Sequence, residues 1–254
     1  MIILSWNVNG LRQLHKSHHF MDAFRHNPDI VCIQETKSPQ DKIPLEIKKL
    51  TGYHSYFADV DKDDFAETAL FTRQQPCAIS SGFGSVPDKE GRVLAADYGS
   101  FLLLNMYFPL GIEPAGTLAQ KLEFFDRFLA YLSSLNNNGK KIVVCGDFSV
   151  AHKDLDTFSE RKKASRQIGI TPEEREKMDA LVNLGFTDTF RTFNSSQGRY
   201  SWWPNGFSHK DRSRGWRLDY FFVNEAMKPF VKDSGIIDGI EGSDHCPVFL
   251  ELKI

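Results

Sequence analysis

Short apolar runs with the composition of buried β-strands recur along the chain, and nearly every one ends in a polar residue able to hold a metal or a phosphate. The polar residues at these positions are Asn7, Glu35, Asp147, Asp219 and, near the last run, Asp244 and His245. Such strands would bring their terminal carboxylates together at one rim of a sheet. Converging carboxylates repel one another unless a cation, a proton or an arginine neutralises them. The pattern therefore predicts a divalent-metal site, with Asp147 and His245 beside it.

The rest of the pattern predicts an α/β fold with more strands than helices. Strands are expected at residues 2–6, 30–34, 54–58, 68–72, 77–80, 93–97, 101–107, 141–145, 200–203, 218–223 and 248–252, and helices at residues 20–25, 118–135 and 172–184. Thr171 suits the N-cap of the last helix, Pro172 its first turn and Gly185 its end. Because helices do not alternate strictly with strands, two packed mixed sheets with helices outside are favoured. No linker is visible, so we expect a single domain spanning residues 1–254.

Composition limits the possible functions. With 41% hydrophobic and 25% charged residues the chain can form a sizeable core. A net charge of only −2 implies that any nucleic-acid site is a local patch. The four scattered cysteines argue against a zinc site or a disulfide framework and for a reducing cytoplasm. Without a targeting segment or a long apolar run, we expect a cytoplasmic protein, nucleoid-associated if prokaryotic, with no membrane partner.

Six motifs, in order along the chain, resemble those of the exonuclease III family, whose members are Mg²⁺-dependent apurinic/apyrimidinic (AP) endonucleases of base-excision repair. They are LSWNVNGLR from Leu4, IQETK from Ile33, NMYFP from Asn105, CGDFSVAH from Cys145, GWRLDYFFV from Gly215 and GSDHCPV from Gly242. The resemblance implies the four-layered α/β sandwich of the endonuclease/exonuclease/phosphatase superfamily, two packed mixed β-sheets flanked by helices. It also implies a monomeric enzyme acting on double-stranded DNA at abasic sites or 3′ ends.

The resemblance implies a Mg²⁺ site at Glu35, Asn7 and Asp244, with Mn²⁺ able to substitute. Oxygen ligands with several retained waters suit Mg²⁺. Taken alone, Glu35 is also explained as a surface carboxylate paired with Lys37.

Catalytic roles are implied for the other strand-end residues. Asp147 would orient or deprotonate the attacking water, Tyr107 would hydrogen-bond the scissile phosphate, and His245 with Asp219 would stabilise a phosphoryl oxygen. Taken alone, the Gly146-Asp147 pair is typical of a turn and Tyr107 of an aromatic at the edge of the core. No residue has the setting of a covalent nucleophile, so direct attack by water is the expected mechanism.

For DNA, the resemblance places Asn9 and Arg12 near the phosphate path and Trp202 and Trp216 around the pocket for a flipped-out sugar. Two core tryptophans are the alternative. Phe65 could wedge against bases in the minor groove. Two basic clusters are interpreted as salt-sensitive phosphate tracks. They comprise Arg161, Lys162, Lys163 and Arg166, and Lys210, Arg212, Arg214 and Arg217.

The chain departs from the family pattern at three places. Ser149 stands where the family has an Asn that helps hold the nucleophile, and losing one preorganised donor of this kind costs on the order of 10²–10³ in rate. Residues 64–67 are acidic at both ends where the family commonly has Gly-Tyr-Ser-Gly, and Leu110 replaces an amide side chain.

The leading interpretation is a Mg²⁺-dependent DNA phosphodiesterase that incises 5′ to abasic sites, acts as a 3′–5′ exonuclease or cleans 3′ ends. One alternative is a catalytically weakened DNA-binding paralogue, which Ser149 motivates. The other is a phosphoesterase of the superfamily acting on RNA or a small phosphate ester.

Overall fold

The computed structural model describes residues 1–254 except 59–66, 85–87, 113–115, 137, 159–166, 168 and 205–212. Its strands form two sheets of six strands each. Sheet A contains β1 (Ile2–Asn7), β2 (Ile30–Gln34), β3 (His54–Phe57), β4 (Thr68–Thr72), β11 (Val231–Ile236) and β12 (Val248–Leu252). Sheet B contains β5 (Ala78–Ser81), β6 (Val93–Asp97), β7 (Leu102–Tyr107), β8 (Ile142–Asp147), β9 (Phe186–Asp188) and β10 (Asp219–Asn224).

The strand orders are β11-β12-β1-β2-β4-β3 in sheet A and β5-β6-β7-β8-β10-β9 in sheet B. The helices are α1 (Leu11–Lys16), α2 (Leu45–Lys48), α3 (Leu118–Asn136), α5 (Pro172–Asn183) and α6 (Thr189–Phe193). Short 3₁₀ helices add η1 (Phe20–His26), η2 (Gln40–Lys42), η3 (Asp154–Asp156) and η4 (Lys228–Phe230).

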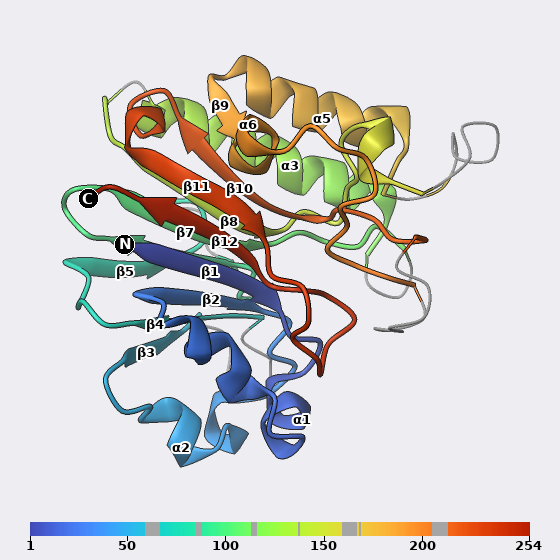
Figure 1. Ribbon diagram of the computed structural model, residues 1–254. Helices are drawn as coiled ribbons and strands as arrows, with labels where there is room; N and C mark the ends of the chain where they lie inside the picture. Colours follow the sequence, from blue (N-terminus) through green and yellow to red (C-terminus); the bar gives the residue numbers. More distant parts are fainter. Residues whose placement is uncertain are drawn as a thin grey trace.

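These elements stack in four layers (Figure 1). The two sheets pack face to face around a core to which Ile3 and Cys32 of sheet A and Leu103 and Cys145 of sheet B contribute. A second core joins the outer face of sheet B to α3 and α5, and a third joins the outer face of sheet A to α1, η1 and α2. The expected four-layered sandwich of two mixed β-sheets flanked by helices is therefore confirmed.

The pairing directions bring distant parts of the chain to one rim. β1 and β2 are parallel, and so are β7 and β8, so the C-terminal ends of each pair lie side by side. β10 runs antiparallel to β8 and pairs Asp219 with Asp147, so the start of β10 lies at the same rim as the end of β8. A hydrogen bond of 2.8 Å from Asn7 Nδ2 to Asp147 Oδ2 then joins the ends of β1 and β8 across the two sheets.

The strand predicted at residues 200–203 is wrong. Trp202 forms only isolated bridges, to Trp216 and to His245, because its backbone pairs with one segment on each side instead of continuing a ladder. β9 and β11 were missed. β11 is an edge strand whose Lys232 and Asp233 are exposed and whose register shifts between Val231 and Asp233, so it lacks an apolar alternation.

The helix predictions hold with two corrections. Residues 20–25 form the 3₁₀ helix η1 instead of an α-helix. The helix predicted at residues 118–135 extends to Asn136, and its buried stripe is Lys121, Phe125, Phe128 and Leu132, with Leu118 and Leu122 half-buried. The cap predicted for α5 is confirmed, because Thr171 Oγ1 accepts from Glu174 N and the Glu174 side chain reaches back to Thr171 N.

Candidate active site

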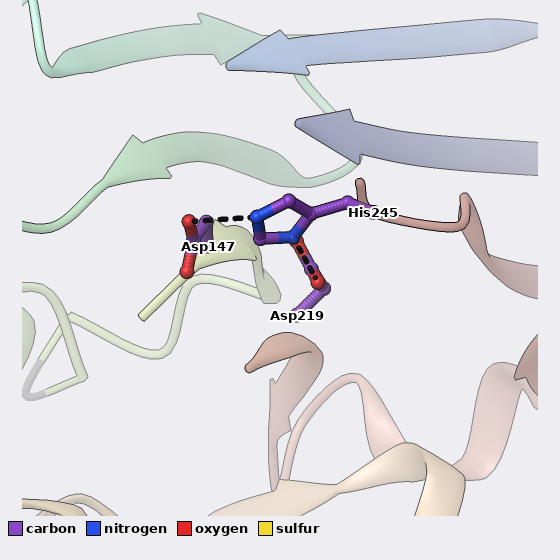
Figure 2. A group of neighbouring side chains, drawn as sticks. All are labelled: Asp147, Asp219 and His245. Atoms are coloured by element: carbon purple, nitrogen blue, oxygen red, sulfur yellow. Dashed lines mark hydrogen bonds and ion pairs between the residues drawn. The ribbon is translucent and has the colours of Figure 1, made fainter. Parts of the chain in front are cut away.

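Three buried side chains meet at the rim where β8 ends and β10 begins (Figure 2). His245 lies between two carboxylates, with Nδ1 at 2.8 Å from Asp219 Oδ2 and Nε2 at 3.9 Å from Asp147 Oδ2. The exposed fractions are 3% for Asp147, 1% for Asp219 and 4% for His245. The predicted grouping of strand-end carboxylates around His245 is thus what the structure contains.

The backbone around His245 is held from sheet A. Trp6 Nε1 donates to His245 O at 3.0 Å, and Ser243 Oγ donates to Asn7 O at 2.7 Å. On the other side, the Ser201 hydroxyl accepts from Asp219 N at 3.1 Å. His245 and Asp219 are therefore fixed by different parts of the fold.

Gly146 allows β8 to reach the rim. Its φ is +135°, and a Cβ added there would lie 1.8 Å from the carbonyl oxygen of Met106 on the neighbouring strand β7. Only glycine tolerates both this backbone conformation and this contact. The glycine before Asp147 therefore allows β8 to stay paired with β7 up to the rim.

Both oxygens of the Asp147 carboxylate accept hydrogen bonds. Its Oδ2 accepts from Asn7 Nδ2 at 2.8 Å, and its Oδ1 accepts from Ser149 N at 2.7 Å and from Ser149 Oγ at 3.3 Å. The Asn7 amide nitrogen also donates to Glu35 Oε1 at 2.9 Å, while its Oδ1 accepts from Asn9 N. Asn7 therefore orients two carboxylates at once.

Backbone strain concentrates at this rim. Of the six non-glycine residues with positive φ in the described parts of the chain, four belong to the network of polar contacts that includes Asp147, namely Asn9, Glu35, Lys37 and Ser149. A left-handed conformation costs a non-glycine residue roughly 1–2 kcal/mol, and such residues cluster at functional sites. The strain therefore supports the same location that the charges indicate.

The carboxylates around His245 favour a proton on its imidazole. Burial by itself lowers the pKa of His245, but the charges of Asp219, Asp147 and Asp244 outweigh it and raise that pKa to about 10. Burial raises the pKa of Asp147, with help from Asp219 and Glu35. At neutral pH His245 is thus an imidazolium between two acidic groups.

The acidic side chains at the rim could hold a divalent cation. Asp147, Asp219 and His245 have potential ligand atoms within 4.8 Å of one another. Glu35 keeps its negative charge, because hydrogen bonds from Asn7 and Lys37 lower its pKa against the effect of burial. The Lys37 ammonium lies 2.5 Å from Glu35 Oε2 and 2.6 Å from Asn9 Oδ1, so the ion pair with Lys37 given as the alternative for Glu35 is present.

Asp244 lies on the far side of Asn9. Its Oδ1 accepts from Asn9 Nδ2 at 2.9 Å and its Oδ2 from Trp202 Nε1 at 2.9 Å. Asn9 in turn accepts from Lys37, so these side chains form one chain of contacts from Glu35 to Trp202. The predicted trio of Glu35, Asn7 and Asp244 therefore lies in one network, with Asn7 making its contacts through its amide nitrogen.

Tyr107, the last residue of β7, faces the same group. Burial raises its pKa, and the charges of Glu35 and Asp147 raise it further, so its phenol remains a hydrogen-bond donor. The Arg92 guanidinium lies 4.9 Å from the centre of the Tyr107 ring. Tyr107 therefore lies beside the carboxylates, and its role as a donor to a phosphate stays a prediction.

The structure places some of the predicted DNA-contacting residues near the trio and does not describe others. Trp202 and Trp216 contact each other edge to face with centroids 5.9 Å apart, and Trp202 lies 6.3 Å from the His245 ring. Trp202 therefore borders the trio, whereas Trp216 packs behind it in a small apolar cluster, as the alternative of a core tryptophan predicts. Asn9 and Arg12 are exposed next to the trio, at the start of α1. Phe65 lies outside the described residues.

One basic residue assigned to a phosphate track was misinterpreted. Arg217 is buried, with Nε at 2.8 Å from Asp156 Oδ1 and Nη2 at 2.6 Å from Asp188 Oδ2, so it serves the fold. Arg214 is exposed, with its guanidinium 5.4 Å from the centre of the Phe158 ring. The other residues of the two clusters, Arg161, Lys162, Lys163, Arg166, Lys210 and Arg212, lie outside the described residues.

Sequence reasoning missed the support behind Asp147. Lys121 donates to Ser149 O and to Glu174, and both charged side chains are fully buried. The sequence signal that could have identified it is spacing, because Lys121 falls on the same helical stripe as Phe125, Phe128 and Leu132.

Among the described residues, no helix has the length and apolar character to cross a bilayer.

Comparison with known proteins gives consistent relatives. Residues 4–245 match the model of the Endonuclease/Exonuclease/phosphatase family. The chain is 33% identical to an exodeoxyribonuclease of Bacillus subtilis over the full length of both chains (100%), and 36% identical to the DNA repair nuclease APEX1 of Danio rerio, covering 100% of this chain and 83% of that one. Among solved structures, the 3′–5′ exonuclease NExo of Neisseria meningitidis superposes with a TM-score of 0.85 at 27% identity, covering 100% of both chains. A 3′ phosphatase NExo from Neisseria, bound to a product DNA hairpin, gives 0.84 at 26% identity, also over 100% of both.

The charge balance around His245 predicts its titration. Asp219→Asn removes the largest favourable charge and should lower the pKa of His245 by at least about 1, because an opposite charge at this distance shifts a pKa by roughly 1–3. Imidazole ¹⁵N chemical shifts recorded against pH would measure it. His152, whose pKa burial lowers, is the internal control and should titrate as before. An unchanged His245 titration in the variant would contradict the assigned pairing.

Proposed function

This chain belongs to the endonuclease/exonuclease/phosphatase family, and we propose that it is a DNA phosphodiesterase of base-excision repair. Its substrates are double-stranded DNA with abasic sites, which it incises on the 5′ side, and DNA 3′ ends. The relatives that support this choice are named exodeoxyribonuclease, DNA repair nuclease and 3′–5′ exonuclease.

One observation carries the proposal. Asp147 and His245 face each other at a buried rim, with opposite charge and with Nε2 and Oδ2 3.9 Å apart. This distance is too long for a hydrogen bond, so the His245 Nε2–H can donate to another group and the Asp147 carboxylate can accept from another group. A phosphate with its attacking water is a partner that needs both an acceptor and a cationic donor.

Each residue has a separate role in the attack of water on the phosphorus. Asp147, gripped by Asn7 and Ser149, accepts the proton of the water as its oxygen bonds to phosphorus, and a carboxyl of raised pKa suits this role near neutral pH. His245 donates to a phosphoryl oxygen, and Asp219 holds the imidazolium in place through Nδ1. The P–O3′ bond breaks, and the leaving oxygen takes a proton from solvent water, so that a 3′-hydroxyl and a 5′-phosphate result. Tyr107 remains protonated and supplies a further donor to the phosphate.

A divalent ion would complete the charge balance. We propose Mg²⁺, with Mn²⁺ as a substitute, held by Glu35 and supported by Asn7 and Asp244. Bound there, it would neutralise charge on the phosphate and stabilise the leaving oxygen.

The proposed partner of the protein is DNA. The relative bound to a product DNA hairpin supports a DNA partner. The monomeric state and the cytoplasmic location are predictions from the sequence.

The first test is cleavage itself. Purified protein with Mg²⁺ should cut a duplex carrying one abasic-site analogue or degrade a recessed 3′ end. Glu35→Gln should lose more than about 100-fold in rate with its fold intact, because an amide is a poorer ligand than a carboxylate and even outer groups of metal sites are worth 10–100-fold. Glu123→Gln, on the exposed face of α3, is the matched control and should retain full rate.

Two outcomes would overturn the proposal. If the wild-type protein binds damaged duplex but cleaves none of these substrates, the DNA-binding alternative replaces it. If it hydrolyses only RNA or a small phosphate ester, the substrate class is wrong. Full activity of Glu35→Gln would remove Glu35 from the mechanism.

Ser149→Asn should raise the rate of cleavage, by an amount on the order of 10², while the Kd for damaged duplex changes little. The Ser149 φ of +52° is a conformation that Asn tolerates better than Ser, so the substitution fits the backbone. Single-turnover cleavage and equilibrium binding would be measured together, with Ser149→Ala as the control that adds no donor. An Asn variant no faster than wild type would show that Ser149 does not limit the rate, leaving the acidic residues 64–67 as the next candidate.

A further inference from the structure

A buried lysine lies directly behind the turn that carries Asp147. Lys121, in the first turn of α3, is 0% exposed, and its ammonium donates to Ser149 O at 2.8 Å and to Glu174 Oε1 at 2.6 Å. Glu174 is also 0% exposed. Because two charges lose their hydration when they are buried, such a pair often stabilises a fold no better than apolar residues of similar size. Stability alone is therefore a weak explanation for this pair.

Glu174 is locked in one orientation by its second oxygen. Oε2 accepts from Gly169 N at 2.7 Å, from Thr171 N at 3.0 Å and from Thr171 Oγ1 at 2.9 Å. Those donors lie just before α5 and at its N-cap, so the Glu174 carboxylate is fixed to the N-terminus of its own helix. The remaining oxygen faces Lys121, whose ammonium is thereby held at one point.

Ser149 links this pair to the site through its backbone. Its carbonyl oxygen accepts from Lys121, while its amide donates to Asp147 Oδ1 at 2.7 Å. Its φ is +52°, a left-handed conformation that a serine adopts only when its surroundings impose it. The hydrogen bond from Lys121 fixes the peptide plane that follows Ser149 and so restrains the ψ angle of this residue. This helps to hold the left-handed conformation in which the preceding peptide plane directs the Ser149 amide at Asp147.

We propose that Lys121, paired with Glu174, is a positioning residue that holds the turn of residues 147–149 in the conformation in which Ser149 N fixes the Asp147 carboxylate. It touches neither substrate nor reacting atoms and acts through Ser149. Its effect on cleavage rests on the proposed function, whereas its effect on the turn does not.

Lys121→Met removes the donor while keeping the length of the side chain. The Ser149 amide should then exchange its hydrogen at least about 10-fold faster, while Val144 in the middle of β8 keeps its protection. Single-turnover cleavage of the abasic duplex should fall at least about 10-fold with the DNA Kd changed less than about 2-fold, because misplacing Asp147 affects the transition state more than ground-state binding.

Two further variants separate positioning from stability. Leu132→Ala removes a fully buried side chain on the same helix, far from Ser149, and should lower Tm with full cleavage and full Ser149 protection. Lys121→Met combined with Glu174→Gln leaves no buried charge and should regain Tm relative to Lys121→Met alone, without regaining cleavage or Ser149 protection.

The outcomes are distinct. If cleavage and Ser149 protection recover together with Tm in the double variant, or if Lys121→Met changes neither, the positioning role is refuted. If Lys121→Met does not fold, cleavage and Ser149 protection of the double variant are compared with those of the wild-type protein instead. If the wild-type protein cleaves no DNA, the proposed function fails, and hydrogen exchange at Ser149 alone decides this inference.

Discussion

The structure depends on keeping two buried carboxylates, Asp147 and Asp219, on either side of one imidazole. Buried like charges are tolerated only when a cation or proton lies between them, and the His245 imidazolium supplies it. Each of the three side chains comes from a different part of the chain. The fold must therefore hold β8, β10 and the loop before β12 in fixed relation, and the stacked sheets do so.

The support for the trio comes from both sides of the sandwich. From sheet A, Asn7 donates to Asp147 and Trp6 to the backbone of His245. From the helical layer outside sheet B, Lys121 and Glu174 reach the backbone of Ser149. Strained residues occur where these supports meet, which is expected when packing over-determines the backbone at a site. The rigidity of the rim is thus a property of all four layers.

Features that depend on neighbouring residues could be predicted from the sequence. Apolar runs ending in Glu35 and Asp147 gave the strands and their rim, and Thr171 gave the cap of α5. Features that depend on distant partners could not. Arg217 looked like a surface cation because Asp156 and Asp188, its buried partners, are far away in sequence.

The same limit explains the other errors. Lys121 interrupts an apolar stripe, and only the tertiary fold reveals that Glu174 neutralises it. The edge strand β11 has no regular apolar alternation because its pairing with β12 shifts register between Val231 and Asp233. Residues 200–203 have strand composition, yet Trp202 is shared between two segments and never enters a ladder. The resemblance to a known family supplied the roles of residues, which composition and periodicity alone left open.

The central claim is that His245 and Asp219 act as one unit opposite Asp147. A double-mutant cycle in single-turnover cleavage of an abasic duplex tests it most directly, with His245→Ala, Asp219→Ala and the double variant compared with wild type. Groups that act as a unit are strongly non-additive, so each single variant should lose about as much rate as the double variant. Losses whose free energies add in the double variant would contradict the account.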